Sequence, residues 1–96
     1  MRGSYHVIVR LEAVPGRGDE LLNALRDLAR ASLTTPMCTG FEVTRSIEDG
    51  SHWLLESFGS EADYHEHVTT SHARYFLEHT LVELVVDRDV TILAPV

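Results

Sequence analysis

Apolar residues recur with a period of two in four segments of the chain and with a period near 3.6 between them. Side chains of a half-buried strand alternate between two faces, whereas a helix places residues three or four apart on one side. The run from Tyr5 to Leu11 shows the first pattern, so the chain is expected to begin with a strand. The patterns together predict strands over residues 5–13, 39–48, 51–58 and 87–94, and helical segments over 19–33, 63–71 and 72–85.

The order β-α-β-β-α-β is typical of a ferredoxin-like α+β fold. Asp49-Gly50 lies between the two central strands, and this dipeptide favours a type I′ hairpin turn with positive φ at both central residues. Right-handed crossovers would place both helical segments on one face of a four-stranded antiparallel sheet. Since the strands carry apolar residues on both faces, two sheets are expected to pack face to face in a homodimer.

The composition excludes several classes of protein. Ninety-six residues suit a single domain, expected over 5–96, with residues 1–4 as a disordered leader. Eight arginines, no lysine and fifteen acidic residues leave a net charge of −7, which disfavours nucleic acid and anionic membranes as partners. Cys38 has no cysteine partner, and no apolar run approaches the roughly 20 residues of a membrane span. A cytoplasmic location is therefore expected.

Three segments of the chain carry a resemblance to a known family: Val14-Pro15-Gly16-Arg17, Leu54-Leu55-Glu56-Ser57-Phe58 and His67-Val68-Thr69-Thr70-Ser71-His72. They are similar to the antibiotic biosynthesis monooxygenase family. The third segment resembles the family's His-x-x-Thr-Pro-His turn, with Ser71 in place of proline. The resemblance covers residues 5–94 and implies a dimeric α+β barrel.

The resemblance implies an enzyme that oxidises a quinol-like or polyketide-derived phenol with O₂ and needs no cofactor. Two alternatives stay open: an isomerase or cyclase using the same pocket, and a non-catalytic dimeric domain for ligand binding or stress response. In that family, members that degrade haem use an asparagine in the first strand. Members that oxidise anthrones use an asparagine either in the first strand or near the third strand. The only asparagine here is Asn23, within the first predicted helix.

Four histidines, His65, His67, His72 and His79, lie within fifteen residues. Seven residues of helix rise about 10.5 Å, so His65, His72 and His79 cannot meet on one metal ion, and no metal site is expected. Imidazole titrates near neutral pH and could remove the proton of a phenol. His67 and His72 flank a predicted bend and are the candidate catalytic bases, although they could instead satisfy backbone groups there.

Four further residues are candidates for binding the substrate: Trp53, Tyr64, Arg74 and Tyr75. An indole can stack on a planar ring, and a phenol or guanidinium can donate to a substrate oxygen. Each has an alternative structural role, such as packing in the core or at a dimer interface. The expected partners are a small aromatic or quinol-like molecule and O₂.

Glu56 lies within an otherwise apolar strand. A buried carboxylate is costly unless it is paired, so this side chain is expected to meet an arginine or a histidine. It could orient a catalytic imidazole or form a structural ion pair. The candidate partners are Arg10, Arg45, Arg74 and the histidines.

Overall fold

The structure, a computed structural model, describes residues 4–96. Its strands are β1 (Tyr5–Ala13), β2 (Cys38–Arg45), β3 (His52–Phe58) and β4 (Val85–Leu93). Its helices are α1 (Gly18–Leu33), α2 (Glu61–Val68), α3 (Ser71–Tyr75), the π-helical turn η1 (Phe76–Thr80) and α4 (Leu81–Leu84). This order confirms the predicted ferredoxin-like arrangement.

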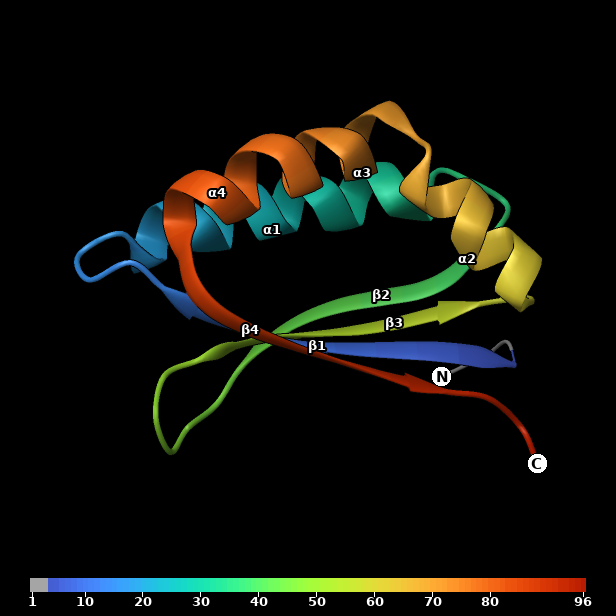
Figure 1. The fold of residues 1–96 in the computed structure, drawn as a ribbon, viewed down its shortest axis with the longest axis horizontal. Helices are drawn as coiled ribbons and strands as arrows, with labels where there is room; N and C mark the ends of the chain where they lie inside the picture. Colours follow the sequence, from blue (N-terminus) through green and yellow to red (C-terminus); the bar gives the residue numbers. More distant parts are fainter. Residues whose placement is uncertain (1–3) are drawn as a thin grey trace.

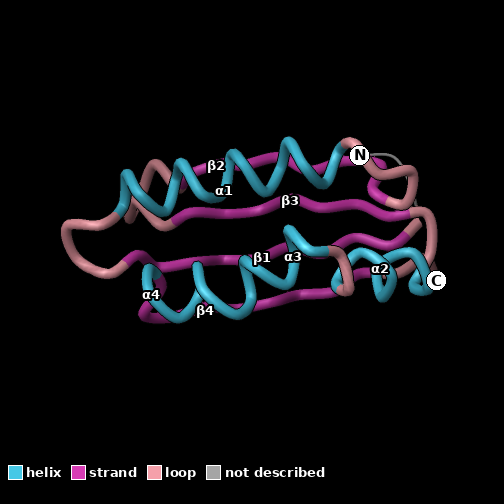
Figure 2. The backbone as a smooth tube through the Cα atoms, turned by 90° about the horizontal axis from the view of Figure 1, so that it is seen from above, coloured by secondary structure: helices cyan, strands magenta, loops and turns pink. Residues whose placement is uncertain are grey.

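The strands form one antiparallel sheet in the order β2-β3-β1-β4. The helices all lie on one side of it, as Figure 1 shows. Seen from above in Figure 2, α1 lies over the β2 side and the segment from α3 to α4 lies over the β4 side. The single layer of helices and the sheet therefore enclose one interior.

Alternation along the strands decides which side chains reach that interior. Val7, Val9 and Leu11 of β1 are buried under the helices, and Leu54 and Phe58 of β3 lie on the same face. Helix α1 contributes Leu21, Leu25 and Leu28 from one stripe, and the segment after α2 contributes Phe76, Leu81 and Leu84. Burial of these apolar side chains, at about 25 cal/mol per Å², is the main force holding the helices on the sheet.

The hairpin between β2 and β3 differs from the predicted type I′ turn. Gly50 has a φ of 77°, but no residue other than glycine has positive φ in residues 4–96, so Asp49 does not take the geometry that this turn requires. Instead the loop is longer, and the Asp49 carboxylate accepts hydrogen bonds from the backbone N–H and the hydroxyl of Ser51, at 2.9 and 2.6 Å. Ile47 consequently lies in the loop and is fully exposed, although the sequence predicts a strand over residues 39–48.

Ser4 extends the pairing at the start of β1. Its backbone N–H donates to the Phe58 carbonyl at 3.1 Å, and its hydroxyl donates to the Gly59 carbonyl at 2.7 Å. Ser4 is thus held against the end of β3, whereas the rest of the expected leader, residues 1–3, lies outside the described residues.

The opposite face of the sheet is not covered by the described residues. It carries Ile8, Trp53 and Leu55, all half-buried, among charged residues of both signs. Arg10 on this face forms ion pairs with Asp87 and Asp89 of β4, at 3.4 and 3.5 Å. The face therefore combines apolar and charged side chains.

Within residues 4–96, no helix combines the length and apolar character that crossing a membrane requires.

Candidate active site

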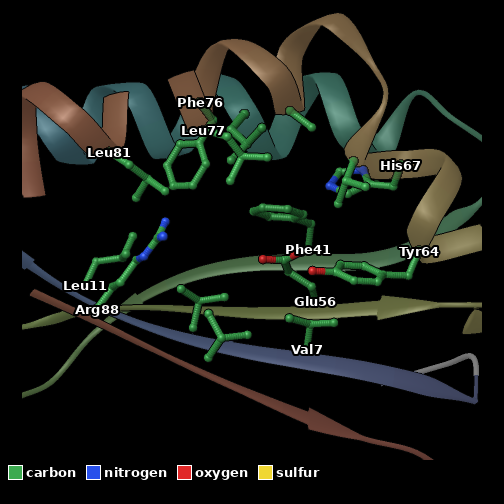
Figure 3. Close-up of a pocket in the computed structure, with 15 residues that line it drawn as sticks. Val7, Leu11, Phe41, Glu56, Tyr64, His67, Phe76, Leu77, Leu81 and Arg88 are labelled. Atoms are coloured by element: carbon green, nitrogen blue, oxygen red, sulfur yellow. The ribbon is translucent and has the colours of Figure 1, made fainter. Parts of the chain in front are cut away.

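A cavity of about 90 Å³ lies between the sheet and the helices (Figure 3). Because a single water needs about 10–15 Å³, the space is large enough for several water molecules. Its walls are mostly aliphatic and aromatic. Four polar side chains reach it from the described residues: Glu56, Tyr64, His67 and Arg88.

Glu56 forms part of the floor of the cavity. It lies in the middle of β3, opposite Val7 of β1 and Phe41 of β2, on the face that the helices cover. Its residue is 6% exposed, and burial raises the pKa of its carboxyl to about 8. The carboxyl is therefore mostly protonated at pH 7, so that it can donate a hydrogen bond, and it becomes a base at higher pH.

The expected partner of Glu56 is not found. Within residues 4–96, no ion pair or hydrogen bond to this carboxyl is present. Arg10 lies on the opposite face of the sheet, and Arg74 pairs with Glu78 at 3.6 Å. The carboxyl meets the cost of burial by staying neutral rather than by pairing.

Tyr64 and His67 come from α2, and Ser60 fixes where that helix begins. The Ser60 hydroxyl accepts a hydrogen bond from the backbone N–H of Asp63 at 3.1 Å, which caps the helix. Tyr64 and His67 are three residues apart, so they project from the same side of α2. Figure 3 shows the Tyr64 hydroxyl directed toward the Glu56 carboxyl. Burial and the nearby Glu56 raise the pKa of the Tyr64 phenol.

His67 is held within an aromatic cluster. Its ring lies 4.9 Å from the Phe58 ring and 6.4 Å from the Phe41 ring, measured between centroids. Burial, and to a lesser degree His72, lowers the pKa of the His67 imidazole to about 4. The Nδ1 atom is buried and has no hydrogen-bond partner among residues 4–96. His67 is thus a neutral imidazole at pH 7 with free hydrogen-bonding capacity.

Arg88 reaches the cavity from β4, at the end away from α2. Figure 3 shows its guanidinium between Leu11 and Leu81. Arg88 is inconspicuous in the sequence, because it lies in an acidic strand segment, Asp87-Arg88-Asp89. Strand alternation is the signal that could have identified it, since residues 87 and 89 share one face and residue 88 takes the other.

The π-helical turn η1 shapes the roof. Phe76 and Leu77 begin this turn, and both line the cavity, as does Leu81 just after it. Single π-helical turns within helices are often found at functional sites. The apolar spacing of residues 72–85 predicts an ordinary helix there, because a one-residue change of helical pitch leaves little trace in a short sequence.

The other residues predicted for the site do not line this cavity. His72 lies behind His67, with 5.9 Å between the ring centroids, and contributes with Tyr75 to a separate depression against α1. Tyr75 packs its exposed ring on His79, and Arg74 is exposed. Trp53 lies on the opposite face of the sheet, where its indole N–H donates to the Ser51 hydroxyl at 2.9 Å. The structure therefore brings together Glu56, Tyr64 and His67 of the predicted set.

Metal ligation receives no support from the side-chain positions. In the described part of the chain, no three His, Cys, Asp or Glu side chains are grouped to hold an ion. Cys38 is buried, and burial raises the pKa of its thiol, which makes it a poor nucleophile.

Comparisons with known proteins agree on the fold. The family described as antibiotic biosynthesis monooxygenase matches residues 4–79. No curated protein matches the chain. The solved structure of PA3566 from Pseudomonas aeruginosa is similar with a TM-score of 0.88 and 21% identity, over 100% of this chain and 97% of that one. Rv0793 from Mycobacterium tuberculosis is similar with a TM-score of 0.88 and 22% identity, over 98% of this chain and 96% of that one. A structure described as an antibiotic biosynthesis monooxygenase has a TM-score of 0.85 and 20% identity, over 96% and 98%.

Proposed function

The chain belongs to the antibiotic biosynthesis monooxygenase family, and on that premise we propose that it oxidises a hydroxylated aromatic compound with O₂. The substrate class is a quinol-like or polyketide-derived phenol. One observation carries the proposal: the buried Glu56 carboxyl, which has no partner among residues 4–96, lies beside Tyr64 and His67 in a mostly apolar cavity. Buried titratable groups with strongly shifted pKa values gather at sites of proton transfer.

The reaction begins with loss of the phenolic proton. The phenolate then gives one electron to O₂, and the two radicals combine into a peroxide anion at a ring carbon that carries hydrogen. The proton taken from the phenol returns to this anion and gives a hydroperoxide. Loss of water from this hydroperoxide leaves a carbonyl, so one oxygen atom enters the product and the other leaves as water. The substrate supplies all the electrons, and the proposed reaction needs no added reductant.

Glu56 is the group best suited to take that proton. A catalytic base works best when its pKa lies near the operating pH, and the Glu56 pKa of about 8 meets this condition. The His67 pKa of about 4 makes its imidazole a weak base, although it remains a good hydrogen-bond partner for the substrate oxygen. We therefore assign Glu56 the proton transfer, and Tyr64 and His67 the positioning of the phenolic oxygen.

The reaction also requires that water be kept away from its intermediates, and the apolar walls of the cavity serve this purpose. Val9, Phe41 and Phe76 line the space around the carboxyl, and such surroundings limit access of water to charged and radical intermediates. An aromatic ring would be held there by contact with these side chains.

Uptake of O₂ by the purified protein tests the function. With a chelator present, a panel of hydroquinones, naphthols and anthrones is expected to include a substrate that consumes one O₂ per product formed. Labelled O₂ should leave one heavy oxygen atom in the product. Proton exchange or rearrangement of a panel member without O₂ uptake would favour the isomerase or cyclase alternative. Binding without any reaction would favour the ligand-binding alternative.

A homodimer is the second part of the proposal. Ile8 and Leu55 lie opposite each other on the uncovered face of the sheet, both half-buried, and charges of both signs surround them. A second copy packed on this face would bury the apolar pair and place unlike charges near one another.

Light scattering with size-exclusion chromatography tests the assembly. The protein is expected to have twice the 10.8 kDa of one chain. Leu55→Arg places a charge in the proposed interface and should shift the mass toward one chain. Val82→Arg, at an exposed position of α4, is the matched control and should leave the mass unchanged. A single-chain mass for the wild-type protein would contradict the dimer.

A further inference from the structure

We infer that the substrate carries a carboxylate at the end opposite its phenolic hydroxyl, and that Arg88 binds it. This inference rests on the proposed function, since it assumes that the phenolic end lies at Glu56. It assigns a second anchoring point within the same cavity and narrows the substrate class to hydroxylated aromatic acids.

The strand register separates the two anchoring points. Glu56 pairs with Val7 of β1, and Arg88 pairs with Leu11 of the same strand. Four residues of strand correspond to about 13 Å between these two positions along β1. Both side chains extend from the sheet into the cavity, as Figure 3 shows, and the wall between them is apolar. A ligand that spans this space is therefore polar at its two ends and apolar between them.

The charges around Arg88 leave its guanidinium free. Its neighbours Asp87 and Asp89 point to the opposite face of the sheet, where both pair with Arg10. Within residues 4–96, no ion pair or hydrogen bond of the Arg88 side chain is present. Glu56 is the only carboxyl lining the cavity in this part of the chain, and burial raises its pKa to about 8. Among the residues that the structure describes, no fixed negative charge therefore neutralises Arg88 within the cavity at pH 7.

The ligand chemistry follows from this isolated cation. The planar guanidinium has donors in a fork that matches the two oxygens of a carboxylate. The chain as a whole has a charge of −7, so it repels anions in general. A cation that reaches the cavity from β4 offsets this repulsion at one position and selects ligands with an anionic end.

Calorimetric titration of matched pairs, without O₂ to prevent turnover, tests the inference. Each pair consists of two compounds with the same ring. One is a hydroxybenzoic or hydroxynaphthoic acid with its hydroxyl and carboxyl at opposite ends, and the other is the phenol or naphthol that lacks the carboxyl. The wild-type protein is expected to bind the acid more tightly in at least one pair. Arg88→Met should weaken binding of that acid by about 10- to 100-fold, the range of a charge-assisted hydrogen bond, and leave the neutral partner unchanged. Arg88→Lys should keep part of the preference, because it keeps the charge and loses the fork.

Controls separate this inference from the proposed function. Arg26→Met makes the same change at an exposed position of α1 and should not alter the preference. Equal binding of acid and neutral partner, or a preference that survives Arg88→Met, would overturn the inference and leave the monooxygenase proposal intact. An Arg88-dependent preference for acids that are never oxidised would support the inference and contradict the reaction. Failure of every pair to bind would contradict both.

Discussion

Replacing Glu56 with glutamine is expected to stabilise the folded protein by about 4 kcal/mol at pH 8, apart from any pH-independent effect of the amide. The reason is the pKa of the buried carboxyl, which burial raises from 4.5 to about 8. Below pH 4.5 the group is protonated in both the folded and the unfolded chain, so it adds no pH dependence. As the pH rises toward 8, the unfolded chain ionises freely and the folded chain does not.

The sign of this effect follows from proton binding. Between pH 4.5 and 8 the folded state holds a proton that the unfolded state has lost, so stability falls as the pH rises. Each pKa unit of difference corresponds to about 1.4 kcal/mol, and the loss stops growing above the folded pKa. Glutamine has nearly the same shape and does not ionise, so this part of the pH dependence disappears.

Urea unfolding of both proteins at equal concentration, from pH 5 to pH 8.5, measures the difference. The gap between Glu56→Gln and wild type should grow by about 4 kcal/mol across this range. His67, whose lowered pKa reduces stability below pH 6.5, contributes equally to both proteins and cancels. Glu66→Gln, the same change at an exposed carboxyl of α2, should show no such growth. A gap that stays constant with pH would mean that Glu56 is not a buried neutral acid.

Periodicity alone is enough to predict the fold, because alternation and helical spacing are set by which face of each element is buried. The β1 run from Val7 to Leu11 illustrates this, since its buried and half-buried positions alternate as the apolar pattern requires. The hairpin between β2 and β3 is also predicted from Asp49-Gly50, but not its type. The loop geometry depends on the Asp49 carboxylate bonding to Ser51, a local contact that competes with the type I′ turn.

The candidate site could be predicted only in part. Glu56 is conspicuous as a charge within an apolar strand, and His67 as part of a histidine-rich bend. Whether Glu56 is paired depends on which arginines share its face, and this requires the strand register. Arg88 was missed for the same reason, since its position in the cavity follows from the pairing of β4 with β1. His72 lies next to His67 in space yet outside the cavity, because α3 starts after a bend at Thr70 that turns it away from α2.

Glu56→Gln is also expected to lower kcat/KM for the phenol identified by O₂ uptake by about 10²- to 10⁴-fold, the usual contribution of a positioned base. This loss should accompany the gain in stability described above. In the wild-type protein, kcat/KM should rise with pH toward a plateau, with a midpoint near 8, because only the ionised Glu56 accepts the proton. The residual activity of Glu56→Gln should lack this transition. The substrate used should have a hydroxyl that ionises well above pH 9, so that its own ionisation is separate from that of Glu56.

Two further variants distinguish the base from a positioning group. Glu56→Asp keeps a carboxyl one methylene shorter, so it should retain a pH transition with reduced kcat. His67→Gln keeps hydrogen-bonding capacity without the imidazole, and the midpoint near pH 8 should persist in it. If the transition instead disappears in His67→Gln and remains in Glu56→Gln, the histidine is the base and the roles assigned to these residues are reversed. The Glu56 carboxyl, which weakens the fold at pH 8, would then have no catalytic role. Its cost in stability would need another explanation, because glutamine could fill the same buried position without ionising.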